Sequence, residues 1–247
     1  MTFHYSIKDG SMFVSFELMM AVIIAAAVLP AIVLLVYIYR HDRLEAESPK
    51  LLRTLVFMGI LSTAFAMVAE TVGEAALSQA GVTGRAYNFI LFFLIVAGAE
   101  EGSKYLLLKK KTWKNPEFNC QFDGVVYATF VSLGFALWEN ISYVMTLGLG
   151  TAVLRAVTAV PGHACFGVYM GAFYGIAKRF ERVGDKASSK FYRALSLIAP
   201  MVLHGTYDYI ATEGSTFFTI LFFAFIILLF STALKLVKRM SREDIYI

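Results

Sequence analysis

The sequence predicts an all-α, polytopic membrane protein with about seven transmembrane helices. Three observations support this fold class. Of the 247 residues, 58% are hydrophobic, the mean hydropathy is +0.66, and the charged residues, 16% of the total, fall in clumps between long apolar runs. About 20 apolar residues cross the hydrocarbon core of a bilayer, and a soluble domain of this size would expose too much apolar surface. We therefore expect one integral membrane domain, residues 1–247, in a cell membrane.

Each apolar run has the length of a membrane helix. The first run, 12–39, is longer than the hydrophobic part of a signal peptide and has no basic flank before it, so we expect it to be a retained helix. The seven predicted helices lie near residues 13–38, 51–74, 87–108, 123–146, 152–178, 190–211 and 215–237.

The basic residues predict the orientation of these helices. Four alternate segments hold 18 of the 22 lysines and arginines, and the other loops hold little beyond Lys8, Arg85 and Arg155. The positive-inside rule places the four rich segments in the cytoplasm, with the amino terminus outside and the carboxy terminus cytoplasmic. The net charge of +4 therefore reflects topology and suggests no nucleic-acid binding. The 18 residues are Arg40, Arg43, Lys50, Arg53, Lys109, Lys110, Lys111, Lys114, Lys178, Arg179, Arg182, Lys186, Lys190, Arg193, Lys235, Lys238, Arg239 and Arg242.

Several ionisable side chains lie within the predicted spans, where they are costly and usually mark function. Four helices each contribute a carboxylate or an imidazole about 16–24 Å from the end at which the helix enters the membrane. In a hydrocarbon core about 30 Å thick these groups all reach the middle third, so we expect them to form one site. The residues are Glu100, Glu101 and Lys104 in the third helix, Glu139 in the fourth, His163 in the fifth, and His204 with Asp208 in the sixth.

The spacing of these residues predicts contacts within helices. Lys104 follows Glu100 by four residues and Glu101 by three, so its ammonium can pair with either carboxylate. Asp208 follows His204 by four residues and can accept a proton from the imidazole, as the carboxylate behind a metal-bound histidine does. Phe135 lies one turn before Glu139, and Asn140 directly follows Glu139.

One carboxylate and two imidazoles form a three-ligand set that leaves an open position on Zn²⁺. We therefore expect Glu139, His163 and His204 to bind zinc and Glu100 or Glu101 to act as the general base on a bound water. In a metal-free version, one glutamate activates water directly and the imidazoles position it. The residues alone leave both versions open, as well as the choice between the two glutamates.

Four segments resemble one known family. AEEGSK at 99–104 is similar to an EExxK motif, GFALWEN at 134–140 to an FxxxE motif, and the surroundings of His163 and His204 to two later histidine motifs. Together they resemble the PrsW-type intramembrane proteases, which are related to the CAAX prenyl endopeptidases and bacteriocin-processing enzymes. The resemblance covers helices three to six, so we expect a catalytic core at about 87–211.

The resemblance implies an integral-membrane metalloprotease that cleaves a membrane-anchored protein or peptide. The best-known members are implicated in cleavage of an anti-sigma factor, so a regulator of that kind is an expected substrate. The resemblance implies catalytic roles for Glu100 and Glu101, a charge partner in Lys104, and ligands in Glu139, His163 and His204. It predicts no oligomeric state.

Two other classes of protein use buried charges. A proton- or metal-coupled transporter could use the same carboxylates and histidines as an ion path, but paired inverted repeats are not visible in the sequence. A seven-helix receptor would have this same topology. Its retinal-binding version needs a lysine within the seventh helix, and 217–234 has none. A non-retinal receptor stays open, but it gives no reason for the buried cluster.

Three local expectations concern single elements. Pro161 and Gly162 could break the fifth helix and open a water-filled cavity. Asp123 has the position of an N-cap for the fourth helix. Glu70 and Glu74, near the outer end of the second helix, are expected at the membrane interface.

Overall fold

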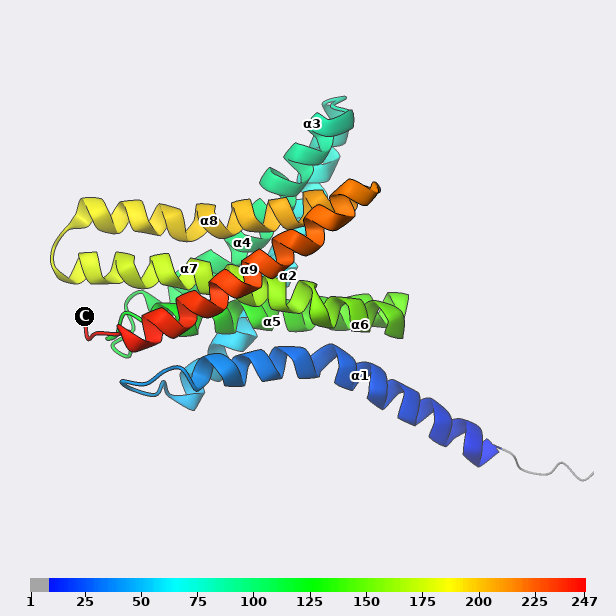
Figure 1. The fold of residues 1–247 in the computed structure, drawn as a ribbon, viewed down its shortest axis with the longest axis horizontal. Helices are drawn as coiled ribbons and strands as arrows, with labels where there is room; N and C mark the ends of the chain where they lie inside the picture. Colours follow the sequence, from blue (N-terminus) through cyan, green and yellow to red (C-terminus); the bar gives the residue numbers. More distant parts are fainter. Residues whose placement is uncertain (1–8) are drawn as a thin grey trace, which may run out of the picture.

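The computed structural model describes residues 9–247, and this part of the chain folds into a bundle of helices without a β-strand (Figure 1). The all-α prediction is confirmed. The helices are α1 (Asp9–Tyr39), α2 (Pro49–Gln79), α3 (Gly84–Phe89), the π-helix η1 (Ile90–Val96), α4 (Ala97–Thr112), α5 (Asp123–Leu147), α6 (Leu149–Val157), α7 (Ala159–Arg182), α8 (Lys186–Thr212) and α9 (Thr216–Arg242).

These elements form seven helical columns in the described part of the chain. The elements α3, η1 and α4 follow one another without a gap and occupy the third predicted span, and α6 with α7 occupies the fifth. Among the described residues, four segments are long and apolar enough to cross a membrane by themselves, namely α2, α5, α9 and residues 153–182. The chain is a multi-pass membrane protein.

The ends of the bundle differ in charge. In Figure 1 the α1–α2 connection, the α7–α8 turn and the carboxy terminus all lie at the left end of the bundle. Three of the four segments rich in lysine and arginine belong to these connections. This arrangement agrees with the prediction that these three segments lie on the same side of the membrane. Their location in the cytoplasm remains a prediction.

Most helices extend beyond their predicted limits at one or both ends. The second was predicted at 51–74, and α2 runs from Pro49 to Gln79. Its start follows from local chemistry, because Ser48 Oγ accepts a hydrogen bond from the backbone N–H of Leu51 at 3.2 Å and proline fits the first helical position.

Two local predictions were wrong in position. The break before His163 lies at Thr158, whose φ of −122° and ψ of −71° separate α6 from α7. Pro161 lies in the first turn of α7, where a missing N–H costs nothing because it has no partner in the helix. Asp123 is the first residue of α5, and its carboxylate accepts backbone N–H groups from the preceding loop at Asn119 and Cys120 instead of capping the helix.

The π-helix η1 shifts the register of the third column just before the glutamate pair. π-segments inside helices often accompany functional sites. Here the segment brings Phe93 against Gly205 of α8, where a Cβ would meet Phe93 Cδ1 at 2.6 Å. Gly205 follows His204 directly, so this close approach holds α8 against the column that carries Glu100 and Glu101.

Glycines allow the closest helix contacts of the bundle. Gly167, Gly171 and Gly175 recur at every fourth residue of α7 and face α5. A Cβ on Gly171 would lie 2.3 Å from the backbone oxygen of Gly124. Because backbone cannot give way as a side chain can, this contact fixes the distance between the helices that carry Glu139 and His163.

A substitution at Gly171 tests this packing. Gly171→Ala should lower the free energy of unfolding by about 1–3 kcal/mol, because the added methyl group forces α5 and α7 apart. The measurement is thermal unfolding of the detergent-purified variant.

The matched control is Gly102→Ala in α4. A Cβ there has no atom within 4 Å, and alanine is the better helix former by about 1 kcal/mol. Gly102→Ala should be neutral or stabilising, and equal loss in both variants would contradict the role given to the α5–α7 contact.

Candidate active site

Three helices bring four buried side chains to one place near the centre of the bundle. Glu100 and Glu101 come from α4, His163 from α7 and His204 from α8. One donor atom from each lies within 4.8 Å of the others, and all four residues are buried. The structure thus brings together Glu100, Glu101, His163 and His204, which were predicted to form one site, whereas Glu139, predicted to join them, lies outside this group.

Lys104 lies at the centre of this group. Its Nζ is 3.0 Å from Glu100 Oε2 and 2.7 Å from Glu101 Oε1, so the ammonium pairs with both predicted carboxylates. Nζ is also 3.2 Å from His163 Nδ1 and 3.9 Å from the ring centroid of Phe135. Phe135 thus closes the remaining side of the ammonium with an aromatic face, which attracts a cation.

His204 lies between two carboxylates. Its Nδ1 is 2.9 Å from Glu101 Oε1, and its Nε2 is 3.3 Å from Asp208 Oδ2, as the spacing predicted. A carboxylate accepts hydrogen bonds and, when ionised, donates none, so both ring nitrogens must donate. This arrangement favours the imidazolium form of His204.

His163 has the opposite surroundings. The Lys104 ammonium can only donate, so His163 Nδ1 accepts, and Nε2–H then donates to Glu139 Oε2 at 2.9 Å. His163 is therefore held as a neutral imidazole. Glu139 lies on the far side of this ring and is not a member of the group that converges within 4.8 Å.

Arg155 of α6 fixes Glu139, a role in the site that was not predicted from the sequence. Its Nη2 lies 2.7 Å from Glu139 Oε2, its Nε donates to Asn140 Oδ1 at 3.1 Å, and the guanidinium covers the ring of Tyr143. Asn140 in turn donates to the backbone oxygen of Ala27 in α1. Arg155 is one of the few basic residues outside the four rich segments. This rarity was the feature of the sequence that could have identified it as a site residue.

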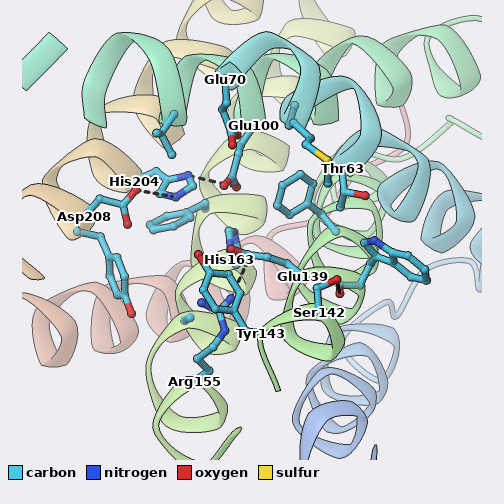
Figure 2. Close-up of a pocket in the computed structure, with 18 of the residues that line it drawn as sticks. Thr63, Glu70, Glu100, Glu139, Ser142, Tyr143, Arg155, His163, His204 and Asp208 are labelled. Carbon is cyan, nitrogen blue, oxygen red and sulfur yellow. Dashed lines mark hydrogen bonds and ion pairs between the residues drawn. The ribbon is translucent and has the colours of Figure 1, made fainter. Parts of the chain in front are cut away.

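A cavity of about 410 Å³ opens beside the group (Figure 2). Glu100, Glu139, His163, His204, Asp208 and Arg155 line it, whereas Glu101 and Lys104 lie behind the lining. Glu70 and Glu74 of α2 also line this cavity, so these expected interfacial residues face the site. Figure 2 shows Glu70 next to Glu100. The cavity distinguishes the two adjacent glutamates, because only Glu100 can reach a molecule in it.

The donor types at the site fit zinc. Two imidazoles and one or two carboxylates within 4.8 Å match the usual ligands of this ion, and the buried Glu101 Oε2 has no hydrogen-bond partner. However, the Lys104 ammonium contacts three of these four residues. Zinc and this ammonium would compete for the same donor atoms.

The site lies within a region shared with known proteins. A family model described as "PrsW family intramembrane metalloprotease" matches residues 47–234. Protease PrsW of Oceanobacillus iheyensis is 33% identical over 223 residues, covering 90% of this chain and 98% of the relative. Protease PrsW of Bacillus subtilis is 37% identical over 196 residues, covering 79% and 85%. No solved structure gives a significant match.

Substitutions of Arg155 test whether its contact with Glu139 stabilises the site. Arg155→Gln should lower the free energy of unfolding by about 2 kcal/mol, because Glu139 loses its charged donor in a partly buried place. Arg155→Lys should recover part of the loss, since one ammonium can reach Glu139 but does not reproduce the guanidinium fork. Thermal unfolding in detergent measures both.

Arg239→Gln serves as the control. The ion pair of Arg239 with Glu243 is exposed, with side chains 70% and 61% accessible, and such pairs contribute about 0–1 kcal/mol. The interpretation fails if Arg155→Gln costs no more than this control.

Proposed function

Because the chain belongs to the PrsW family of intramembrane proteases, we propose that it hydrolyses a peptide bond of a membrane-anchored protein inside the cavity beside Glu100. The membrane peptidase class follows from the family, and the remaining assignments are inferences from the site. Family membership also favours a peptidase over the transporter alternative.

The observation that carries the proposal is the position of Glu100. This carboxylate lines the cavity together with His163 and His204, and its Oε2 is held by the Lys104 ammonium at 3.0 Å. A carboxylate with one oxygen fixed and one side open to a cavity suits a general base that takes a proton from water. Glu101, fully buried, serves to hold Lys104 and His204 in place.

The other groups complete an acid–base pair. His204, held as an imidazolium by Glu101 and Asp208, can stabilise the oxyanion that forms when water attacks the carbonyl carbon. It can then donate its proton to the leaving amine. His163 remains neutral and keeps its orientation through Glu139 and Arg155.

Zinc belongs to this proposal as a bound cofactor. His163, a neutral His204 and one of the two adjacent glutamates would hold it, in place of the set with Glu139 expected from the sequence. The imidazolium role of His204 therefore belongs to the metal-free version alone. When bound, the ion would lower the pKa of a water ligand and polarise the substrate carbonyl. The position of Lys104 supports a second candidate, a metal-independent glutamate protease in which the ammonium supplies the positive charge at the site.

We propose the class of the substrate, a protein that is itself anchored in the membrane. A cavity inside a bundle of membrane helices suits a chain that is itself anchored in the membrane, and an anti-sigma-factor-like regulator is one such protein. The residues that bear the chemistry all lie within 100–208, which supports a catalytic core at about 87–211.

Glu100→Gln tests the base. The amide keeps the size of the side chain but cannot take a proton, so cleavage of a membrane-anchored substrate by the purified protein should fall by about 10²–10⁴-fold. The fold should persist, because the amide oxygen can still accept a hydrogen bond from Lys104. Cleavage in proteoliposomes and thermal unfolding in detergent measure the two effects.

Glu243→Gln, at an exposed position, is the control and should cleave at the unmodified rate. Full activity of a folded Glu100→Gln variant would show that Glu100 is not the base. Glu101 would then be the candidate.

Metal content separates the two candidate mechanisms without a known substrate. Zinc at about one ion per chain, lost when His163 and His204 are both changed to alanine, is the result expected of a zinc enzyme. Metal-free wild type with cleavage activity is the result expected of a glutamate protease. In that second case Lys104→Met should increase zinc uptake, because the competing ammonium is gone. Elemental analysis of detergent-purified protein provides the measurement.

A further inference from the structure

A groove of about 450 Å³ opens between α1 and α2, close to the loop that joins these two helices. We call it the α1–α2 groove. Leu52 of α2 and Phe130 of α5 are buried at its base, whereas Val36 and Tyr39 on the α1 side are exposed. The walls are therefore apolar and open to the surroundings of the bundle, which in a membrane are lipid chains.

One charged side chain, Arg53 of α2, lines the α1–α2 groove, and it is exposed. Its Nε donates to the backbone oxygen of Pro49 at 3.1 Å, which fixes the direction of the guanidinium. None of the ion pairs among residues 9–247 includes Arg53. The N–H groups on its terminal Nη atoms therefore remain available for an acceptor outside the protein.

Two further basic residues lie at the same end of the groove. Lys50 precedes Arg53 by three residues and so lies on the same side of α2, and Arg40 directly follows Tyr39 at the end of α1. Both are exposed, and neither takes part in an ion pair with a described residue. No acidic side chain lines the groove. This end of the groove thus carries a positive charge without a partner in the described part of the chain.

The groove runs from this basic end along the apolar flank of the bundle. Its α1 wall extends from Tyr39 back to Ile32, which is about 10 Å of helix. In Figure 1 the α1–α2 connection lies at the left end of the bundle, together with the α7–α8 turn and the carboxy terminus. Tyrosine is typical of the interface between membrane and water, so Tyr39 indicates the level of the lipid head groups.

We propose that the α1–α2 groove binds an anionic phospholipid of the phosphatidylglycerol class. Its phosphate lies against Arg53, and one of its acyl chains lies between α1 and α2 over Leu52 and Phe130.

Charge complementarity selects this occupant. A guanidinium binds phosphate oxygens through two parallel N–H groups, which makes the contact strong and directional. Lys50 and Arg40 then favour a head group with a net negative charge, as basic pockets between membrane helices do. Phosphatidylcholine has the same phosphate but adds a cationic choline group, which these two residues would repel.

A second groove on the bundle provides an internal comparison. It lies between α2 and α4, has a volume of about 350 Å³ and includes Phe65, Ala69 and Leu106 in its lining, but no charged side chain lines it. Acyl chains can fill this groove without any choice of head group. Arg53 is therefore the feature that distinguishes the α1–α2 groove.

The first experiment adds phosphatidylglycerol or phosphatidylcholine with identical acyl chains to the full chain, purified in an uncharged detergent. Saturating phosphatidylglycerol should raise the apparent Tm by about 5 °C above the value in phosphatidylcholine. Native mass spectrometry of the same samples should show one phosphatidylglycerol molecule held per chain. Arg53→Gln should weaken this binding by about tenfold or more and lose the rise.

Arg239→Gln is the matched control for charge. It removes an equally exposed arginine at the same end of the bundle, away from the α1–α2 groove, and should keep the full rise. In phosphatidylcholine, Arg53→Gln should unfold at the same temperature as the unmodified chain, because the side chain is exposed and unpaired. This comparison separates loss of lipid binding from loss of stability.

A second pair of variants tests the place of the acyl chain. Val36→Trp fills the α1–α2 groove and leaves Arg53 in place, so it should abolish the rise specific to phosphatidylglycerol. Ala69→Trp fills the α2–α4 groove and should retain it.

Three outcomes would overturn the proposal. An equal rise with both lipids would show that the head group is not recognised. A full rise in Arg53→Gln or in Val36→Trp would place the lipid elsewhere. A rise with inorganic phosphate alone, equal to that with phosphatidylglycerol, would identify an anion site without a lipid. None of these measurements depends on peptidase activity.

Discussion

The structure of the site depends on one buried ammonium. Lys104 is fully buried at the centre of the bundle, and it contacts two carboxylates on its own helix, an imidazole on α7 and an aromatic ring on α5. Each of these charges alone would be expensive inside a membrane. Together they compensate one another, because the carboxylates and the ring surround the cation on several sides. The lysine thereby determines which groups around it can carry a charge and fixes the orientation of Glu100 towards the cavity.

From Lys104 a continuous set of hydrogen bonds and ion pairs runs across the site in both directions. Towards α8 it passes through Glu101 and His204 to Asp208, and towards α5 through His163 to Glu139 and Arg155. The two histidines differ because their neighbours differ. One is flanked by two acceptors and holds two protons, and the other lies between a donor and an acceptor and holds one. The carboxylate of Glu100 and the imidazolium of His204 both line the cavity, and they suit the base and the acid of a hydrolysis.

The bundle supports this network through close contacts that leave little freedom. Backbone touches backbone where Gly171 meets Gly124, and the π-helix η1 presses Phe93 against Gly205, next to His204. α6 lies between the breaks at Gly148 and Thr158 and brings Arg155 over Glu139. At the other end of the bundle, Asp123 accepts the backbone N–H groups of Asn119 and Cys120, and Asp244 accepts that of Phe122. The helix that carries Glu139 is thus fixed at its beginning by these carboxylates, along its length by α7 and at Glu139 by Arg155.

The all-α membrane class, the seven helical columns and the residues of the central group could be predicted from the sequence, because apolar length and the cost of buried charge act locally and can be read residue by residue. The i, i+3 and i, i+4 spacings also predicted the contacts of Lys104 and Asp208. Helix packing was needed to show that Glu100 faces the cavity while Glu101 lies behind it, that Glu139 lies outside the converging donors, and that Arg155 and Glu70 join the site. These features depend on helix rotation and on the distance between helices. Such quantities arise from packing between segments far apart in the chain, for which the periodicity of a single helix contains no information.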